Sequence, residues 1–257
     1  MKPITVVKIG TNLLTTPSGK LDLNNLRELV NQLVDEWALG KQWLVLVTSG
    51  AITTGSERLG LVPESIPQKQ AAAAVGQILL MQEYGHFFGQ RGIPIGQLLL
   101  SKDAFLDPVR SNHISNTLVT LLKQGVLPII NENDTVATDE IRFGDNDELS
   151  CLVTALVGAR TLYLMTDIDG LYTANPKKEA GAVLMEHIPE VSEAVLALAQ
   201  DLPNQRSRGG MRSKLLSARE AALAGAEVVI ANGRRENVLA NLFSGKAVGT
   251  RIGGSGK

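Results

Sequence analysis

Three short turns along the chain combine glycine with small or cationic residues. They cover residues 8–12, 48–51 and 208–214, with the sequences Lys-Ile-Gly-Thr-Asn, Thr-Ser-Gly-Ala and Arg-Gly-Gly-Met-Arg-Ser-Lys. Glycine lets backbone N–H groups approach a phosphate closely, and a helix N-terminus adds partial positive charge. The three turns therefore predict a phosphate-binding site. Ordinary loop turns are the alternative, because none has the spacing of a Walker A loop or a GxGxxG turn.

Two lysines beside these turns are candidates for contact with that anion. Lys8 lies within an apolar strand pattern, where a lysine is costly unless it is paired or faces a polar site. Lys214 follows Gly210 by four residues. A helix lysine in such a position is often a solvated surface residue, which is the alternative here. Its place beside a glycine pair favours a role in phosphate binding.

The segment of residues 131–147 is rich in carboxylates and amides, with six acidic residues between two apolar elements. Its two ends, residues 131–134 and 145–147, adjoin those elements and are expected at the rim of the core. Asp139 and Glu140 instead fit a solvated loop. Carboxylates and amides of this kind can hold a substrate ammonium group, orient the lysines or bind Mg²⁺. The sequence leaves these three roles open.

Cysteine and histidine offer little chemistry in this chain. Cys151 is the single cysteine, falls on a helical pattern, and is predicted to be a buried structural thiol. His86, His113 and His187 lack the spacing of metal ligands, so no metal site is predicted from them.

Composition and charge exclude several classes of protein. The 257 residues carry 25 lysines and arginines against 26 acidic residues, a net charge of −1. Such a balance lacks the excess of positive charge that is typical of proteins that bind nucleic acid or membrane surfaces. No apolar run approaches the ~18 residues that a membrane helix needs. No secretory leader is recognisable. With a single cysteine, these features favour a cytoplasmic protein.

Short β-branched runs alternate with helical periods along the chain, which is typical of βα units. The predicted fold class is α/β, a mostly parallel open sheet with helices on both faces. Strands are expected at residues 5–9, 43–47, 95–100, 127–130, 161–165 and, as the last buried strand, 227–231. Helices are expected at residues 22–39, 68–84, 114–123, 148–156, 189–200 and 211–224. No linker interrupts the series, so residues 1–252 are expected to form one domain and residues 253–257 a flexible tail.

Six motifs together resemble the amino acid kinase family. They lie at residues 7–11, 47–52, 130–138, 144–147, 164–172 and 209–214, and the likeness runs from about Val6 to Thr250. The lysine and glycine motifs are shared widely in that family. The Asn-Glu-Asn-Asp of residues 131–134 and the Gly-Asp-Asn-Asp of residues 144–147 are much more specific to the branch that phosphorylates free glutamate.

The resemblance implies an α/β/α sandwich and a defined reaction. That reaction is ATP-dependent phosphorylation of the γ-carboxylate of L-glutamate, the first step of proline biosynthesis, with Mg²⁺ accompanying ATP. The implied catalytic residues are Lys8, Lys214 and Asp147, with Asp147 orienting the two lysines. The implied substrate-binding residues are Ser49, Gly50, Ala51, Asn131, Asp134, Asp145 and Asn146. The implied nucleotide-binding residues are Lys8, Gly10, Thr166, Asp167, Arg208, Gly209, Gly210, Met211, Arg212, Ser213 and Lys214.

The resemblance also implies partners and shows two departures from the family pattern. L-proline is expected as a feedback inhibitor and the chain as a homo-oligomer, with no nucleic-acid or membrane partner. Many relatives carry a C-terminal PUA domain, and this chain is expected to be a short form without one. Arg208 and Ser213 stand where the family commonly has threonine, so the individual phosphate contacts of that loop are undecided.

Other functions stay open on the sequence. Another amino acid kinase, acting on acetylglutamate, aspartate, carbamate or UMP, shares the lysine and glycine motifs, but the acidic motifs disfavour it. A non-catalytic amino-acid-sensing module would bind glutamate or proline without turnover, but Lys8, Lys214 and Asp147 are all retained. A nucleotide-binding oxidoreductase is poorly supported, because the first strand does not lead into a GxGxxG turn.

Overall fold

The computed structural model describes residues 2–136, 146–176, 178–199 and 210–254. These residues form an eight-stranded sheet with the order β3-β4-β2-β1-β5-β7-β8-β6. The strands are β1 Ile4–Ile9, β2 Trp43–Val47, β3 Ile95–Leu100, β4 Leu127–Glu132, β5 Thr161–Thr166, β6 His187–Ile188, β7 Glu227–Asn232 and β8 Thr250–Ile252. Neighbouring strands are parallel except β7 and β8, which are antiparallel.

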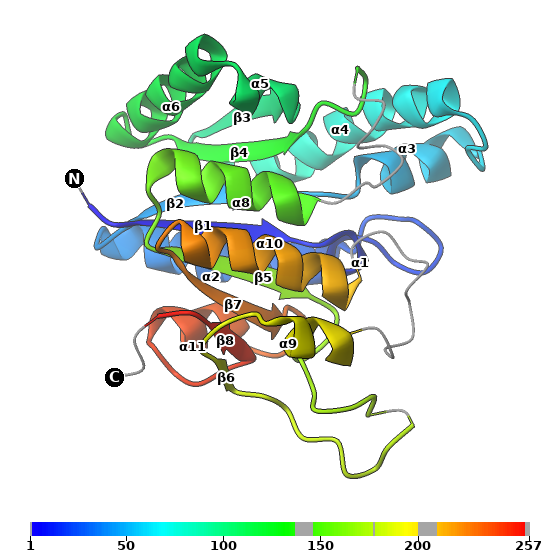
Figure 1. Cartoon of the computed structure of the whole chain (residues 1–257). Coiled ribbons are helices and arrows are strands. Elements are labelled where there is room, and N and C mark those ends of the chain that lie inside the picture. Colours follow the sequence, from blue (N-terminus) through cyan, green and yellow to red (C-terminus); the bar gives the residue numbers. More distant parts are fainter. Residues whose placement is uncertain (1, 137–145, 177, 200–209, 255–257) are drawn as a thin grey trace.

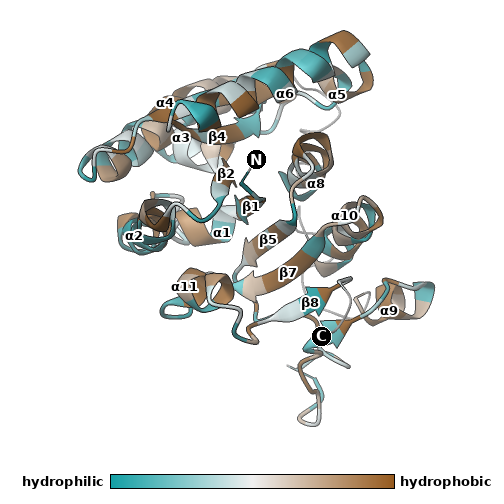
Figure 2. Ribbon diagram, turned by 90° about the vertical axis from the view of Figure 1, so that its left-hand side faces the viewer, coloured by the Kyte–Doolittle hydropathy of each residue, from teal (hydrophilic) through white to brown (hydrophobic). Residues whose placement is uncertain are grey.

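Helices cover both faces of this sheet (Figure 1). They are α1 Thr11–Leu14, α2 Leu23–Leu39, α3 Ala51–Leu59, α4 Ile66–Gly89, α5 Asp103–Leu106, α6 Pro108–Lys123, α8 Asn146–Val157, α9 Glu193–Leu198, α10 Met211–Leu223 and α11 Val238–Phe243. Figure 2 shows α2, α3, α4 and α11 on one side of the strands and α6, α8, α9 and α10 on the other. The predicted class, a mostly parallel open sheet between two layers of helices, is confirmed.

Two apolar layers, one on each face, hold the helices to the sheet. Along β1 the side chains alternate between them: Val6 packs in the layer under α6, α8 and α10, and Val7 packs in the layer under α2, α4 and α11. Both valines are fully buried. A central strand of a parallel sheet is covered on both faces, which explains why its apolar residues are consecutive.

Several elements begin and end where their sequence signals lie. β2 and β3 have the predicted bounds. α2 is capped by the Asp22 side chain and ends at Gly40, which has a left-handed φ of 64°. α4 begins earlier than predicted because Ser65 and Gln68 form a capping box, and α6 begins earlier because Asp107 caps it.

Three further details differ from the sequence prediction, in addition to the short elements α1, α5, β6 and α11, which it does not contain. The helix expected at residues 189–200 is limited to α9, because Ser192 caps it at a later residue. The strand at residues 227–231 is not the last, since β8 follows it, pairs antiparallel with β7 and buries Ile252. β8 has only three residues, too few for a periodic pattern. α3 has no predicted counterpart, because its Thr-Thr-Gly stretch has low helix propensity and depends on packing against α4.

Candidate active site

Polar residues gather where the parallel strands end. Lys8 lies near the end of β1, Ser49 follows β2, Asn131 lies near the end of β4 and Thr166 ends β5. Helices α3, α8 and α10 begin at the same edge, on the right in Figure 1. Because the carboxyl ends of parallel strands share one edge of a sheet, segments far apart in the sequence meet there.

Two buried lysines share one buried carboxylate at this edge. Lys8 Nζ lies 2.5 Å from Asp147 Oδ1, and Lys214 Nζ lies 2.8 Å from Asp147 Oδ2. Lys8 is 4% exposed, Lys214 6% and Asp147 0%. With all three ionised, the group carries one net positive charge, and charge is costly to bury unless it is paired. Such a group is suited to hold a further anion.

The strand or helix that carries each of the three charged residues determines where its side chain lies. Side chains alternate along a strand, so Lys8 shares a face of β1 with Ile4 and Val6. That face packs in the layer under α8 and α10. Lys8 therefore points toward the first turns of these helices, which carry Asp147 and Lys214. A carboxylate in the first turn of α8 is further stabilised by the partial positive charge of the helix N-terminus.

A chain of side-chain amides lies on the substrate side of the edge. Asn146 Nδ2 donates to the Thr48 carbonyl at 2.6 Å, to Ser49 Oγ at 3.0 Å and to Asn131 Oδ1 at 2.7 Å. Asn131 Nδ2 donates in turn to Gln77 Oε1 at 2.7 Å. The contacts join β2, β4, α4 and α8. They bring three of the predicted substrate residues together.

Gln77 is a member of this chain that the sequence prediction omits. It lies within the Ala-rich run of α4 and is 9% exposed. Its only sequence signal is an amide on the helix face that also carries the buried Ala73, Leu80 and Tyr84. A polar residue at a position that the helical period assigns to the core is costly without a partner, and here the partner is Asn131.

The other predicted substrate residues lie around these amides or outside the described residues. Gly50 has a left-handed φ of 95°, which lets α3 begin directly after β2 with Ala51 buried at its first position. Asp134 is partly buried in the turn that follows β4. Asp145 lies outside the described residues.

Hydrogen bonds link the turn after β1 to the end of β5, and each of them involves one predicted nucleotide residue. The Gly10 N–H donates to the Met165 carbonyl at 3.1 Å, and Asn12 Nδ2 donates to Asp167 Oδ2 at 3.0 Å. A Cβ at Gly10 would lie 3.2 Å from that carbonyl, so the turn leaves little room for a side chain. Thr166 is buried, whereas Asp167 is exposed at the rim.

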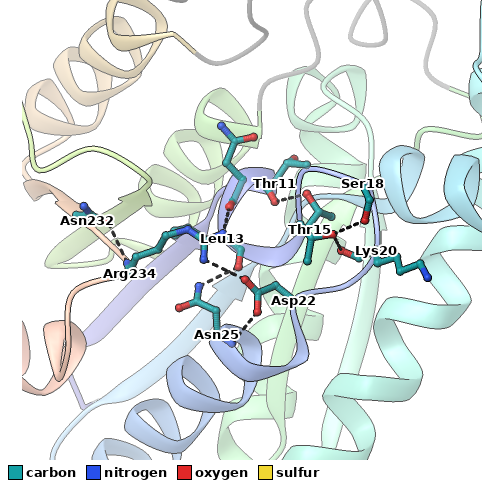
Figure 3. A network of polar contacts seen from close by, with 11 residues as sticks. Thr11, Leu13, Thr15, Ser18, Lys20, Asp22, Asn25, Asn232 and Arg234 are labelled. Carbon is teal, nitrogen blue, oxygen red and sulfur yellow. Dashed lines mark hydrogen bonds and ion pairs between the residues drawn. The ribbon is translucent and has the colours of Figure 1, made fainter. Parts of the chain in front are cut away.

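Arg234, in the turn after β7, fixes the position of the short helix α1 and the residue before it, although it lies near the other end of the chain (Figure 3). Its Nη2 donates to the Asn12 carbonyl at 2.7 Å, and its Nη1 lies 3.0 Å from Asp22 Oδ2 at the start of α2. Asn25 Nδ2 also donates to the Leu13 carbonyl at 2.8 Å. The sequence prediction omits Arg234, because two of its acceptors are a distant backbone carbonyl and a distant cap residue.

The loop before α10 is described from Gly210 onward. Gly210 is the N-cap of α10, Met211 and Lys214 are buried, and Arg212 is exposed. Ser213 is partly buried, and Arg208 and Gly209 lie outside the described residues. The structure thus brings Lys214 to Asp147, while the phosphate contacts expected of the loop stay predictions.

Cys151 is buried, as predicted, on the second turn of α8. Burial raises the pKa of its thiol to about 12, so the thiol is protonated at neutral pH and is no nucleophile. Among the described residues, no group of three or more His, Cys, Asp or Glu side chains is arranged to hold a metal. No helix in this part of the chain is both long and apolar enough to cross a membrane.

A separate pocket of about 410 Å³ lies beyond the end of β7, with Asp169, Asn232, Arg235 and Val248 in its lining. Arg235 donates to both carboxylate oxygens of Asp169, at 2.8 and 2.6 Å. This hydrogen-bonded ion pair lowers the pKa of Asp169 to about 2. It ties the loop after β5 to the turn after β7.

Residues 3–232 match the model of the amino acid kinase family. A protein of Moorella thermoacetica named glutamate 5-kinase is 47% identical over 247 residues, which are 95% of this chain and 65% of that protein. A protein of Clostridium tetani with the same name is 44% identical over 247 residues, 95% of this chain and 92% of that protein. The chain thus spans about two thirds of the length of the first relative and nearly all of the second.

Solved structures show the same fold. A UMP kinase of Bacillus anthracis superposes with a TM-score of 0.66, covering 98% of this chain and 96% of that one, at 16% identity. An isopentenyl phosphate kinase superposes with a TM-score of 0.61, covering 97% of this chain and 99% of that one, at 18% identity. At such identities the likeness concerns the fold alone.

Proposed function

The chain belongs to the amino acid kinase family, and on that premise we propose that it transfers the γ-phosphoryl group of ATP to the γ-carboxylate of L-glutamate. The product, L-glutamyl 5-phosphate, is the first intermediate of proline biosynthesis. The observation that carries the proposal is the pair of buried lysines on Asp147, with the amides of Asn131 and Asn146 on the neighbouring strands and helix. The lysines suit a phosphoryl group and the amides suit an amino acid.

The residues present fit a nucleoside triphosphate. Lys8 and Lys214 supply buried positive charge, and Gly10 keeps the turn after β1 free of a side chain. Thr166, Asp167 and the residues from Arg208 to Lys214 are proposed to hold the nucleotide. Mg²⁺ is proposed to enter with ATP and to be held largely by its phosphates, as is usual for this ion.

Transfer of the phosphoryl group needs positioning and charge neutralisation rather than a protein nucleophile. The γ-carboxylate of glutamate is ionised at neutral pH, so its oxygen can attack the γ-phosphorus without a general base. A phosphorus–oxygen bond to glutamate forms as the bond from the γ-phosphorus to the bridging oxygen of ADP breaks. Lys8 and Lys214 stabilise the charge that develops on the transferred group and on ADP, and Asp147 keeps both ammonium groups in place.

Glutamate is proposed to bind between the end of β2, the end of β4 and the start of α8. Ser49, Gly50 and Ala51 are proposed to form one wall, and Asn131, Asp134 and Asn146 the other. Asp145 is proposed as a further contact on the family resemblance alone. Carboxylate and amide oxygens of the second wall receive the α-ammonium group of free glutamate. Acetylglutamate lacks that group, so it should leave these oxygens unpaired.

An ADP-release assay with L-glutamate, D-glutamate, aspartate and acetylglutamate tests the proposal. L-glutamate should exceed acetylglutamate at least tenfold in kcat/KM, since unpaired buried groups cost about 1–3 kcal/mol each. Hydroxylamine should trap the acyl phosphate as a hydroxamate. Equal turnover of acetylglutamate would indicate another kinase of the family. Binding of glutamate without ADP release would indicate a sensing module.

We also propose that L-proline inhibits at the glutamate site. Proline carries the same α-carboxylate and a cationic amine but no γ-carboxylate to phosphorylate, so groups that hold the shared charges can hold an unreactive ligand. Proline should then raise the apparent KM for glutamate with little effect on kcat. Inhibition that saturating glutamate does not relieve would place proline elsewhere. We further propose that the chain forms a homo-oligomer and acts in the cytoplasm, as the sequence analysis expects.

A further inference from the structure

The amides of Gln77, Asn131 and Asn146 run in one direction, because backbone groups fix that direction at two points. The Thr48 carbonyl can only accept, so Asn146 turns its Nδ2 toward it at 2.6 Å. The Glu132 N–H can only donate, so Asn131 turns its Oδ1 toward it at 2.9 Å. Asn131 Nδ2 is therefore directed at Gln77, which must offer Oε1.

Gln77 keeps this orientation although half of its amide is left without a partner. Its Nε2 is buried and makes no hydrogen bond in the part of the chain that the structure describes. A reversed amide would set Gln77 Nε2 against Asn131 Nδ2, two donors face to face. A buried unpaired donor costs free energy and is rare in native proteins. The acceptor oxygen of Gln77 is therefore the atom that the site requires.

The direction of this series of amides determines which atom of Asn146 faces away from β2 and β4. The three hydrogen bonds of Asn146 Nδ2 turn that nitrogen toward β2 and β4. Its Oδ1, bonded to the same carbon on the other side of the Cβ–Cγ axis, faces away from the groups that Nδ2 contacts. Asn146 is partly exposed, whereas Asn131 and Gln77 are buried. A carbonyl oxygen accepts from an ammonium group and repels a carboxylate.

We propose that Gln77 is a positioning residue for amino acid selectivity: through Asn131 it keeps the acceptor oxygen of Asn146 toward the α-ammonium group of the substrate. The proposal rests on the proposed function, because it concerns how the same site recognises an amine. Without Gln77 Oε1, the buried donor of Asn131 loses its partner. The direction of the two remaining amides is then held only by the Thr48 carbonyl and the Glu132 N–H. With this weaker restraint, a reversed pair in which Asn146 presents a donor to the ammonium group becomes more populated.

Kinetics with L-glutamate and with glutarate test this role, because glutarate keeps a γ-type carboxylate but lacks the α-ammonium group. In Gln77→Met, the ratio of kcat/KM for glutamate to that for glutarate should fall about tenfold. The KM for glutamate should rise, and the KM for ATP should not change. If glutarate turns over too slowly to measure, its inhibition constant against glutamate is determined instead, and its reciprocal takes the place of kcat/KM for glutarate in the ratio.

Two further variants separate positioning from folding. Gln77→Glu keeps an acceptor oxygen for Asn131 and should restore most of the selectivity. Gln82→Met makes the same chemical change at an exposed position of α4 and should behave as the wild type. If Gln77→Met does not fold, Gln77→Leu provides the same loss of acceptor with a similar volume.

A selectivity ratio within about twofold of the wild type in folded Gln77→Met would overturn the role, since the expected change is tenfold. An equal fall for both ligands would mark Gln77 as structural only. Failure of the wild type to phosphorylate glutamate would refute the proposed function instead. In that case the affinities of the Gln77 variants for glutamate and glutarate, measured by calorimetry, still decide the role of Gln77.

Discussion

At the scale of single residues, the site depends on buried charges that contact one another. Lys8, Lys214 and Asp147 together take three charges out of water. Breaking a buried ion pair by removing one partner typically costs about 3–5 kcal/mol. In this group, the loss of one lysine leaves Asp147 with the other. A lysine variant can therefore fold while its chemistry fails.

Lys214→Ala should lower kcat about a hundredfold or more, because the charge that stabilises the transferred phosphoryl group is lost. The KM for glutamate should change much less, since the substrate amides are untouched. The assay is ADP release at saturating ATP and glutamate. Arg219→Ala, on the same helix and partly exposed, is the matched control and should keep its kcat. A folded Lys214→Ala protein with near-normal kcat would show that Lys214 does not act on the transferred group.

Asp169 should make a contribution to stability that disappears in acid. Its folded pKa of about 2 lies below the ~3.9 of an unfolded aspartate, so Arg235 and Asn232 stabilise its charged form. This contribution is fully present above pH ~4 and is lost as the pH falls through about 2. Because Arg235 is largely exposed, solvent screening limits it to about 1 kcal/mol.

Urea unfolding of the wild type and of Asp169→Asn at several pH values measures this contribution. The wild type should be more stable at pH 7, and the difference should shrink toward zero near pH 2. A difference that stays constant with pH would show that packing or the Asn232 hydrogen bond, and not the charge, is responsible.

At the scale of elements, α3 and α4 approach so closely that glycine is required between them. A Cβ at Gly55 would lie 1.8 Å from the Ala72 carbonyl oxygen, and one at Gly76 would lie 1.8 Å from the Ala51 carbonyl oxygen. Ala51 opens α3 beside Ser49, and Gln77 follows Gly76. The contact therefore sets the spacing between two parts of the proposed glutamate site.

Gly76→Ala should destabilise the protein by about 1–3 kcal/mol, because the added methyl group must separate two helices. This cost should exceed the ~1 kcal/mol that alanine gains over glycine in helix propensity. Chemical denaturation measures it, and the KM for glutamate should rise in parallel. Gly85→Ala, on the same helix, meets its nearest atom at 3.9 Å and should be neutral or stabilising. Equal stabilities of the two variants would show that the helices separate at little cost.

At the scale of the whole molecule, the edge of the sheet joins segments from the entire chain. The proposed glutamate site draws on β2, β4 and α8, and the proposed nucleotide site draws on β1, β5 and α10. Asp147 connects the two sites through its contacts with Lys8 and Lys214. A ligand that bridges these segments binds the folded chain alone and must stabilise it.

L-glutamate at a hundred times its Kd should raise the free energy of unfolding by about 2.7 kcal/mol, and so should L-proline at a hundred times its own. If the two ligands share a site, proline added to saturating glutamate should raise the Tm no further. Mg²⁺ and ADP should raise the Tm further, because the proposed nucleotide residues are separate from the proposed glutamate residues. Differential scanning calorimetry measures these shifts. Additive stabilisation by glutamate and proline would contradict a shared site.

The sequence by itself determined the α/β class, six of the strands and the helices α2, α8 and α10 to within two residues, and a set of candidate residues. These features rest on local signals: short β-branched apolar runs for the buried strands, the helical period of 3.6, and the residues that stop or cap the helix ends. Lys8 stood out because a charge in an apolar strand is costly wherever that strand is buried. α3 and β8 were beyond such signals, since each depends on packing or pairing with a partner element.

Only the tertiary structure decided which candidates meet. It brought Lys8 and Lys214 to opposite oxygens of Asp147, and it added Gln77 and Arg234, which no motif marks. The physical reason is that ion pairs and hydrogen bonds between distant segments depend on distances of a few ångströms. Those distances are set by the register of the parallel strands and by the approach of the helices packed on them. A local pattern records which residues are polar, but not which of them share a partner.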